Sequence, residues 1–273
     1  MIRFVSDSSG IEADAGFDST IPNVARVYDY MLGGKDNFAA DRQLAEQLLA
    51  EFPVSSWIAR QNRAFLGRAV RYCAEQGIDQ FLDVGSGLPT MDNVHEVARR
   101  VIPGATVMYV DNDRVALAHA KALLATSPGV SAHWGDVREP GKILADVRDS
   151  GLIDLSRPIV VLLAAILHFI ADDEDPAGIV QVFRDAMPAG SYLVLSHATH
   201  DTLPEESARA RNMYRDRGAS SSLATRSRAD IAAFFTGLEL VDPGLAFTSQ
   251  WRPEDLEQIS EPTDLYAGVA RKP

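Results

Sequence analysis

The residues best suited to chemistry stand at the end of an apolar segment, where an acid is followed by closely spaced glycines. Asp83 precedes Gly85 and Gly87, which stand two positions apart. Glycine lacks a Cβ, so the backbone can turn sharply here and present its N–H groups to a ligand that approaches closely. A second acid, Asp111, ends the apolar segment 106–110. A carboxylate can accept hydrogen bonds from both hydroxyls of a diol, so the pattern predicts a site for a ribose-bearing cofactor.

The charge of this loop distinguishes two kinds of ribose-bearing cofactor. Dinucleotide-binding loops read Gly-x-Gly-x-x-Gly, because a pyrophosphate sits against the following helix N-terminus. Here Thr90 stands in place of the third glycine, and Asp83 stands before the first. A carboxylate at that position repels a pyrophosphate and attracts an ammonium group. The residues therefore favour S-adenosylmethionine, which carries an ammonium group and no phosphate, over a nicotinamide cofactor.

Three short motifs resemble those of class I S-adenosylmethionine methyltransferases. They are Asp-Val-Gly-Ser-Gly at 83–87, Val-Asp-Asn-Asp at 110–113 and Gly-Asp-Val at 135–137. More narrowly, residues 23–38, with the run VYDYMLGGKDNF, are similar to the opening signature of an uncharacterised bacterial S-adenosyl methyltransferase family. The resemblance covers nearly the whole chain, from about Pro22 onward. It implies a Rossmann-like methyltransferase fold and S-adenosylmethionine as cofactor, and it does not identify the methyl acceptor.

Each motif is expected to serve a different part of the cofactor. Asp83 is predicted to serve the amino-acid end and Asp111 the ribose, with Asn112 and Asp136 at the adenine. The alternative for the strand-end acids is capping of a turn or a helix, and Asp113 could cap the helix instead. The predicted cofactor-binding residues are Asp83, Gly85, Ser86, Gly87, Asp111, Asn112, Asp136 and Val137.

A general base is sought among the histidines that follow the central strands. His168 follows the apolar segment 159–167, at the edge where ligands bind in open α/β sheets. Its imidazole could remove a proton from an attacking oxygen or nitrogen, or it could be a packed core histidine. His197 follows the next predicted strand and is a similar candidate on the acceptor side. No spacing of His, Cys or carboxylate residues predicts a metal site.

The signature segment 28–37 combines aromatic, acidic, glycine and amide residues within a short length of chain. We expect it to fold over the cofactor, with Tyr28 and Asn37 near cofactor or acceptor and Lys35 or Asp36 orienting them. Such a lid would exclude water and align the acceptor for attack. The alternative is ordinary helix packing that ends at two glycines.

The alternation of strands and helices predicts a parallel sheet. The resemblance adds a seven-stranded, mostly parallel sheet with the last strand antiparallel. Three parts are expected: a flexible N-terminal arm at 1–20, a helical cap at 21–77 and the methyltransferase domain at 78–273. The predicted strands lie near 80–84, 106–111, 130–134, 159–165 and 191–197, the helices near 92–101, 114–125, 139–149 and 176–187, and the closing elements near 227–236, 238–247 and 264–271.

Composition narrows the class of partner. The formal charge of −12 argues against nucleic acid or an anionic membrane as the main partner. The single cysteine, Cys73, and the absence of a signal-peptide pattern predict a cytoplasmic location. The function predicted is methyl transfer from S-adenosylmethionine to an oxygen or nitrogen of a small molecule. The alternatives are a nicotinamide-dependent oxidoreductase and a non-catalytic S-adenosylmethionine-binding protein.

Overall fold

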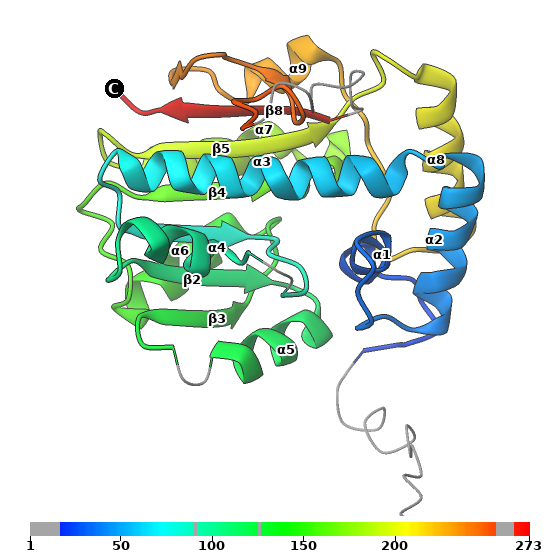
Figure 1. The fold of residues 1–273 in the computed structure, drawn as a ribbon, viewed down its shortest axis with the longest axis horizontal. Helices are drawn as coiled ribbons and strands as arrows, with labels where there is room; N and C mark the ends of the chain where they lie inside the picture. Colours follow the sequence, from blue (N-terminus) through cyan, green and yellow to red (C-terminus); the bar gives the residue numbers. More distant parts are fainter. Residues whose placement is uncertain (1–16, 90–91, 125–126, 255–264) are drawn as a thin grey trace, which may run out of the picture.

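The computed structural model describes residues 17–89, 92–124, 127–254 and 265–273. One mixed sheet runs through the molecule, with helices on both of its faces (Figure 1). Within the described residues the sheet has eight strands in the order β3-β2-β1-β4-β5-β8-β6, and β7 pairs with β8. The strands are β1 (Gln80–Val84), β2 (Thr106–Asp111), β3 (Val130–Trp134), β4 (Val160–Ala164), β5 (Tyr192–Ala198), β6 (Glu239–Leu240), β7 (Ala246–Phe247) and β8 (Leu265–Arg271).

The predicted α/β sheet with an antiparallel last strand is confirmed. Strands β1 to β5 are parallel, and β8 runs antiparallel between β5 and β6. The described sheet has one strand more than expected, because the segment 238–247 forms two short strands instead of one. Pro243 and Gly244 interrupt it: proline has no N–H for the ladder, and Gly244 has a φ of +85°.

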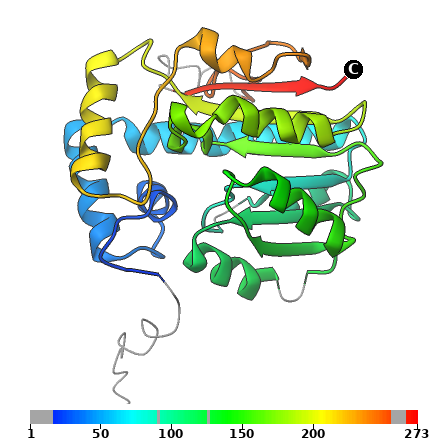
Figure 2. The ribbon, with the colours of Figure 1, turned by 180° about the vertical axis from the view of Figure 1, so that it is seen from behind.

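Each face of the sheet has its own hydrophobic core, because successive side chains of a strand point to opposite faces. On β1, for example, Phe81 joins one core and Leu82 the other. The predicted connecting helices are present, and Figure 2 shows the second face with its helices. The first face carries α3 (Ser55–Glu75), α4 (Val94–Val101) and α5 (Arg114–Leu124), and the second carries α6 (Pro140–Ser150), α7 (Pro176–Ala186) and α9 (Arg228–Ala233). No helix in these described ranges is both long and apolar enough to cross a membrane.

A helical cap covers the carboxyl end of the sheet. It consists of α1 (Val24–Met31), α2 (Ala39–Glu51) and α8 (Pro204–Asp216), beside the start of α3 (Figure 1). Val27, Leu44 and Tyr214 share one core there. The cap therefore takes one helix from far outside 21–77, while α3 leaves the cap and packs on the sheet through Phe65. Most of the predicted N-terminal arm lies outside the described residues.

One buried cation ties the cap to the sheet. Arg26 is 2% exposed, and its Nε lies 2.9 Å from Asp41 Oδ2 in α2. Its Nη1 lies 2.7 Å from Asp113 Oδ2, just beyond β2. Asp113 also caps α5, because its Oδ1 accepts a hydrogen bond from the Ala116 N–H at 2.9 Å. The Arg26 guanidinium thus connects the cap to the end of β2.

Candidate functional site

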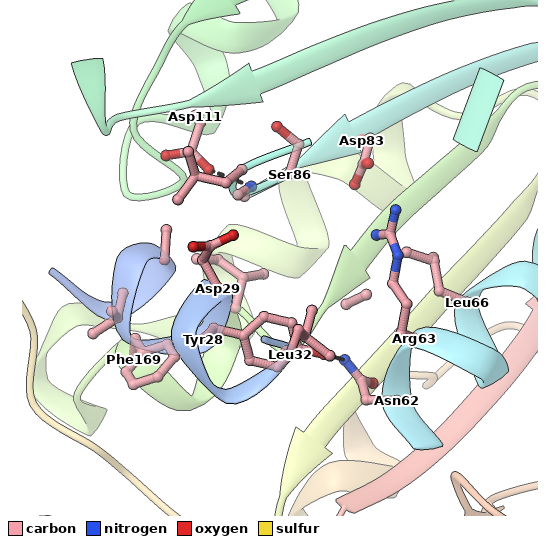
Figure 3. A pocket seen from close by; sticks show the side chains of 18 of the residues that line it. Tyr28, Asp29, Leu32, Asn62, Arg63, Leu66, Asp83, Ser86, Asp111 and Phe169 are labelled. Carbon is pink, nitrogen blue, oxygen red and sulfur yellow. Dashed lines mark hydrogen bonds between the residues drawn. The ribbon is translucent and has the colours of Figure 1, made fainter. Parts of the chain in front are cut away.

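A cavity lies between the cap and the carboxyl ends of β1, β2 and β4 (Figure 3). It encloses about 830 Å³, including the part open to solvent, and we call it the main pocket. Its walls come from α1, α3, the loops after β1 and β4, and the end of β2. The residues that matter for its chemistry are Tyr28, Asp29, Asn62, Arg63, Asp83, Gly85, Ser86, Gly87, Asp111, Asn112 and Phe169.

Glycine is required at positions 85 and 87, after β1, for two different structural reasons. Both have a positive φ, +75° for Gly85 and +65° for Gly87. A Cβ on Gly85 would lie 2.6 Å from Ile166 Cγ1, so this glycine lets the loop after β4 pack closely. A Cβ on Gly87 would meet nothing within 4 Å. Gly87 therefore leaves open space above a backbone that a ligand can approach.

Asp111 stands at the end of β2 with both oxygens already oriented. Its Oδ2 accepts a hydrogen bond from the Gly87 N–H at 2.7 Å, and its Oδ1 accepts one from the Asp113 N–H at 2.8 Å. Burial raises the pKa of Asp111 to about 6. Each carboxylate oxygen can accept a second hydrogen bond, so the group remains able to bind a diol.

Asp83, on β1, faces the same pocket. It is 4% exposed, and among the described residues no side chain or N–H donates a hydrogen bond to its carboxylate. Burial raises the pKa of Asp83 to about 7, an effect that the Arg63 guanidinium opposes and the Asp111 charge reinforces. Figure 3 shows Arg63 reaching from α3 toward Asp83. This pair offers one anion and one cation, the two groups that the ammonium and carboxylate of an amino acid require.

A side pocket of about 460 Å³ continues the main pocket toward β3. Gly85, Asp111 and Asn112 line both, and Val137 and Arg138 line the side pocket alone. Predicted residue Asp136 does not line either pocket. Its Oδ2 accepts a hydrogen bond from Asn112 Nδ2 at 3.0 Å, and it also pairs with Arg138, so it holds Asn112 in place.

Helices α1 and α3 line the pocket with Tyr28, which the sequence singled out, and with Asn62, which the motifs did not predict. The Tyr28 hydroxyl donates to the Ala59 carbonyl at 2.9 Å and accepts from Asn62 Nδ2 at 3.0 Å. Asn62 Oδ1 in turn accepts from Ser196 Oγ at 2.6 Å, and Ser196 Oγ accepts from the Ala165 N–H at 2.9 Å. This chain of hydrogen bonds fixes the pocket wall opposite the glycine loop.

Asp29 explains why the signature segment combines glycine, acidic and amide residues. This buried carboxylate lines the pocket, and its Oδ2 accepts hydrogen bonds from Asn37 Nδ2 at 2.8 Å and from the Asp36 N–H at 3.1 Å. A Cβ on Gly34 would lie 2.0 Å from Asp29 Oδ1, so only glycine fits there. Burial raises the pKa of Asp29. Asn37 thus acts through Asp29 rather than in the pocket, and Lys35 is exposed outside it.

The two predicted histidines lie behind the pocket wall and do not line the cavities described above. His168 Nδ1 accepts a hydrogen bond from the Ala198 N–H at 3.2 Å, and burial holds the pKa of His168 well below its usual value. His197 Nε2 accepts one from Arg226 Nη1 at 2.7 Å, and burial lowers the pKa of His197 to about 3. Arg226 also donates to the Leu167 carbonyl at 3.1 Å, so this group supports the loop after β4.

The residues present fit the predicted cofactor in three respects. Open space lies over Gly87, the carboxylate of Asp83 faces the cavity, and the main and side pockets adjoin each other at Asp111. The described residues contain no group of three His, Cys or acidic side chains placed to hold a metal ion.

Comparisons with known proteins agree with this geometry. The model of the S-adenosyl methyltransferase family matches residues 11–273. A crystal structure of a DUF574 family protein from Streptomyces avermitilis is 38% identical, with a TM-score of 0.88, and the match covers 94% of this chain and 99% of that one. A candidate methyltransferase from Thermobifida fusca is 40% identical, with a TM-score of 0.86 over 96% and 99% of the two chains.

A search of curated proteins found no match. The family model nevertheless spans nearly the whole chain, and both crystal structures share its fold at high identity. The chain therefore belongs to the S-adenosyl methyltransferase family and is an enzyme that uses S-adenosylmethionine as its cofactor.

Proposed function

We propose that this methyltransferase transfers the methyl group to an oxygen or nitrogen of a small molecule, in a site formed by the main and side pockets. The observation that supports this best is the row of groups along the carboxyl ends of three adjacent strands. Asp83 is the next-to-last residue of β1, Asp111 ends β2 and Val137 follows β3, and each lines the main pocket or the side pocket that adjoins it. Their order matches the amino-acid, ribose and adenine parts of one extended cofactor.

In this proposal each end of the cofactor meets the chemistry it needs. Asp83 accepts hydrogen bonds from the ammonium group, and Arg63 binds the carboxylate beside it. Asp111 accepts hydrogen bonds from the ribose diol, with Gly85, Ser86 and Gly87 forming the floor. Val137 and Asn112 contact the adenine, and Asp136 acts by positioning Asn112.

The acceptor is proposed to bind against the cap. Tyr28, Leu32 and Asn62 line the main pocket and not the side pocket toward β3, whereas Phe169 lines both. When bound, S-adenosylmethionine supplies an electrophilic methyl group on a sulfonium, which is a good leaving group. The chain then has to hold the acceptor in line and exclude water, and the partly buried Tyr28–Asn62 hydrogen bond makes that wall rigid.

A base role for His168 stays a prediction that the geometry does not favour. Its Nδ1 is occupied by a backbone N–H, and its burial opposes the charged form that a base must reach. We propose instead that His168 and His197 position the loop after β4. An acceptor that arrives deprotonated requires no base.

The remaining proposals concern the protein's partners and its location in the cell. A small acceptor suits the enclosed pocket, and the net charge of −12 makes nucleic acid an unfavourable partner. We also propose a cytoplasmic location, which the single, free and buried Cys73 supports.

Two measurements test the proposal. Calorimetry should detect binding of S-adenosylhomocysteine and none of NADH; the reverse result would favour the oxidoreductase alternative, which the family match does not support. Incubation of a bacterial metabolite extract with S-adenosylmethionine labelled in its methyl group should give a labelled small molecule. Tight cofactor binding without any labelled product from several extracts would favour the non-catalytic alternative.

A further inference from the structure

A groove rich in arginine lies on the outer side of α3, next to the main pocket. It encloses about 1050 Å³, including the part open to solvent, and lies between α3, α4 and the segment after β7. We call it the arginine groove. Its charged residues are Arg60, Arg63, Arg68, Arg71, Arg100, Asp92 and Glu254.

The charge of the groove is opposite to that of the protein. Five arginines against two carboxylates give it a formal charge of +3, whereas the whole chain carries −12. Four of the arginines come from α3 at spacings that place them along one side of the helix. Such a concentration of guanidinium groups in a concave site attracts anions and binds carboxylate or phosphate oxygens in pairs.

The floor of the groove is open to a ligand. It is formed by the small residues Ala64 and Gly67, and a Cβ on Gly67 would meet nothing within 4 Å. Arg68 fixes the far wall, because its Nε donates to the Trp251 carbonyl at 2.9 Å and its Nη2 to the Thr248 carbonyl at 2.6 Å. The groove is therefore a formed concavity with a rigid side.

The other arginines can exchange their present contacts for a ligand. Arg71 pairs with Glu254 and Arg100 with Asp92, and all four side chains are at least 44% exposed. Exposed pairs of this kind contribute little stability, so an anion can displace them at low cost. Arg60 is exposed and makes no hydrogen bond or ion pair with any residue that the structure describes.

The groove adjoins the main pocket. Leu32 and Arg63, both labelled in Figure 3, line the arginine groove and the main pocket alike. A molecule whose anionic group lies in the groove can therefore extend past these two residues toward the cofactor.

We propose that the methyl acceptor is a small anionic molecule that carries phosphate or carboxylate groups, and that the arginine groove binds this part of it. The inference rests on the proposed function and narrows its substrate class. An extended polyanion such as nucleic acid does not suit the groove, because it would continue onto the acidic remainder of the surface.

A binding experiment on the full chain tests this inference without needing the acceptor. The protein, saturated with S-adenosylhomocysteine, is titrated with tripolyphosphate and separately with citrate, which distinguish phosphate from carboxylate recognition. The double variant R60Q/R100Q should bind the preferred anion roughly tenfold or more weakly, since each lost charge-assisted hydrogen bond is worth about that factor. Binding by the unmodified chain should also weaken with added salt.

The matched control is R148Q/R215Q, which removes the same charge from exposed positions on α6 and α8, outside the groove. Its anion affinity should be unchanged, and both variants should unfold at the temperature of the unmodified protein. Equal anion binding by the two double variants, or no binding of either anion at millimolar concentration, would overturn the inference.

A second readout connects the groove to the reaction. Labelled products from a metabolite extract should be retained on an anion-exchange column, and R60Q/R100Q should form less of them than the control variant. Neutral labelled products formed equally by both variants would contradict the inference. If S-adenosylhomocysteine itself does not bind, the proposed function fails; if it binds and the anions do not, only the inference about the groove fails.

Discussion

At the ends of β1 and β2 the polar side chains face a cavity, whereas at the ends of β4 and β5 they face other protein atoms. Asp83 and Asp111 line the main pocket. His168 follows β4 and His197 is the next-to-last residue of β5, but these histidines bind the Ala198 N–H and Arg226. The comparison shows that a place at the carboxyl edge of a parallel sheet does not by itself make a functional residue. What decides is whether the fold already supplies a partner.

We call the ends of β1 and β2 the ligand-facing half of the sheet edge and the ends of β4 and β5 its inward-facing half. Burial has a different effect on the polar groups of these two halves. Burial raises the pKa values of Asp83 and Asp111, so their ionised forms are held in the fold at a cost. His197 is buried and neutral, and Arg226 and a carbonyl satisfy its two ring nitrogens. Perturbed carboxylates in a cavity are typical of a binding site, and satisfied neutral groups are typical of a core.

The largest loss of stability is expected at Arg26, which connects the cap to the end of β2. Arg26→Met leaves Asp41 and Asp113 buried without their cation, which should lower the free energy of unfolding by about 3–5 kcal/mol. Arg209→Met is the matched control, because it removes an exposed pair with Glu51 within the cap and should cost about 0–1 kcal/mol. Urea denaturation measures both, and equal losses would show that the buried link is not the main anchor.

The next largest effect separates the two glycines of the ligand-facing loop. Gly85→Ala must tolerate a positive φ and a contact of 2.6 Å with Ile166, and it should lose about 2–4 kcal/mol of stability. Gly87→Ala meets only the φ penalty, about 1 kcal/mol, but places a methyl group where the cofactor is proposed to lie. It should therefore weaken S-adenosylhomocysteine binding more than it weakens folding. Calorimetry measures the binding and thermal unfolding measures the stability. A Gly87→Ala protein that loses stability but keeps its affinity for S-adenosylhomocysteine would show that the space over Gly87 is not the binding site.

Asp111 tests the ligand-facing half directly. Asp111→Ala should weaken S-adenosylhomocysteine binding by about 1–3 kcal/mol, because hydrogen bonds to a charged acceptor are lost. Asp154→Ala is a suitable control, since Asp154 is an acceptor for Ser156 in the loop before β4 and outside the pockets described here. An unchanged calorimetric affinity of the Asp111 variant would remove the ribose assignment.

The pH dependence of binding should report Asp83. Its pKa of about 7 exceeds the value of about 3.9 in an unfolded chain, so the folded protein without ligand retains a proton that the unfolded chain has lost. The resulting contribution to stability is complete below about pH 4 and is lost as the pH rises through about 7. Binding of the ammonium group requires the ionised form, so S-adenosylhomocysteine affinity should rise about tenfold between about pH 6 and pH 8. Asp83→Asn should abolish that rise, and a rise that persists in the variant would assign it to another group.

The ligand-facing half was accessible from the sequence because its signals are local. Apolar runs that end in an acid and a glycine loop mark β1 and β2, and all five parallel strands were placed to within one residue of the observed ends. Asp29, Asn62 and Arg63 could not be found in this way. They come from α1 and α3, where a polar residue on a helix is usually solvated, and only the packing of the cap turns these side chains toward the pocket.

The histidines show the converse limit. Their place near the carboxyl ends of β4 and β5 is visible in the sequence, but the residues that bind them are distant along the chain: Ala198 lies 30 residues from His168, and Arg226 lies 29 from His197. The eighth strand was missed for a related reason, since β6 and β7 are defined by their pairing with β8 rather than by their own composition.

The smallest effect should come from His168→Asn, and it decides whether His168 is a structural residue or a general base. Asn can place a carbonyl oxygen where His168 Nδ1 now accepts from Ala198, so His168→Asn should keep both the fold and methyl transfer almost unchanged. His168→Leu lacks that acceptor and should lose about 1–3 kcal/mol of stability, because a buried N–H is left unsatisfied. The rate of S-adenosylhomocysteine formation with an extract as acceptor source is the measurement. An amide cannot replace a general base. A large loss of rate in a stably folded His168→Asn protein would therefore restore the catalytic assignment of His168 and show that the end of β4 also takes part in the reaction.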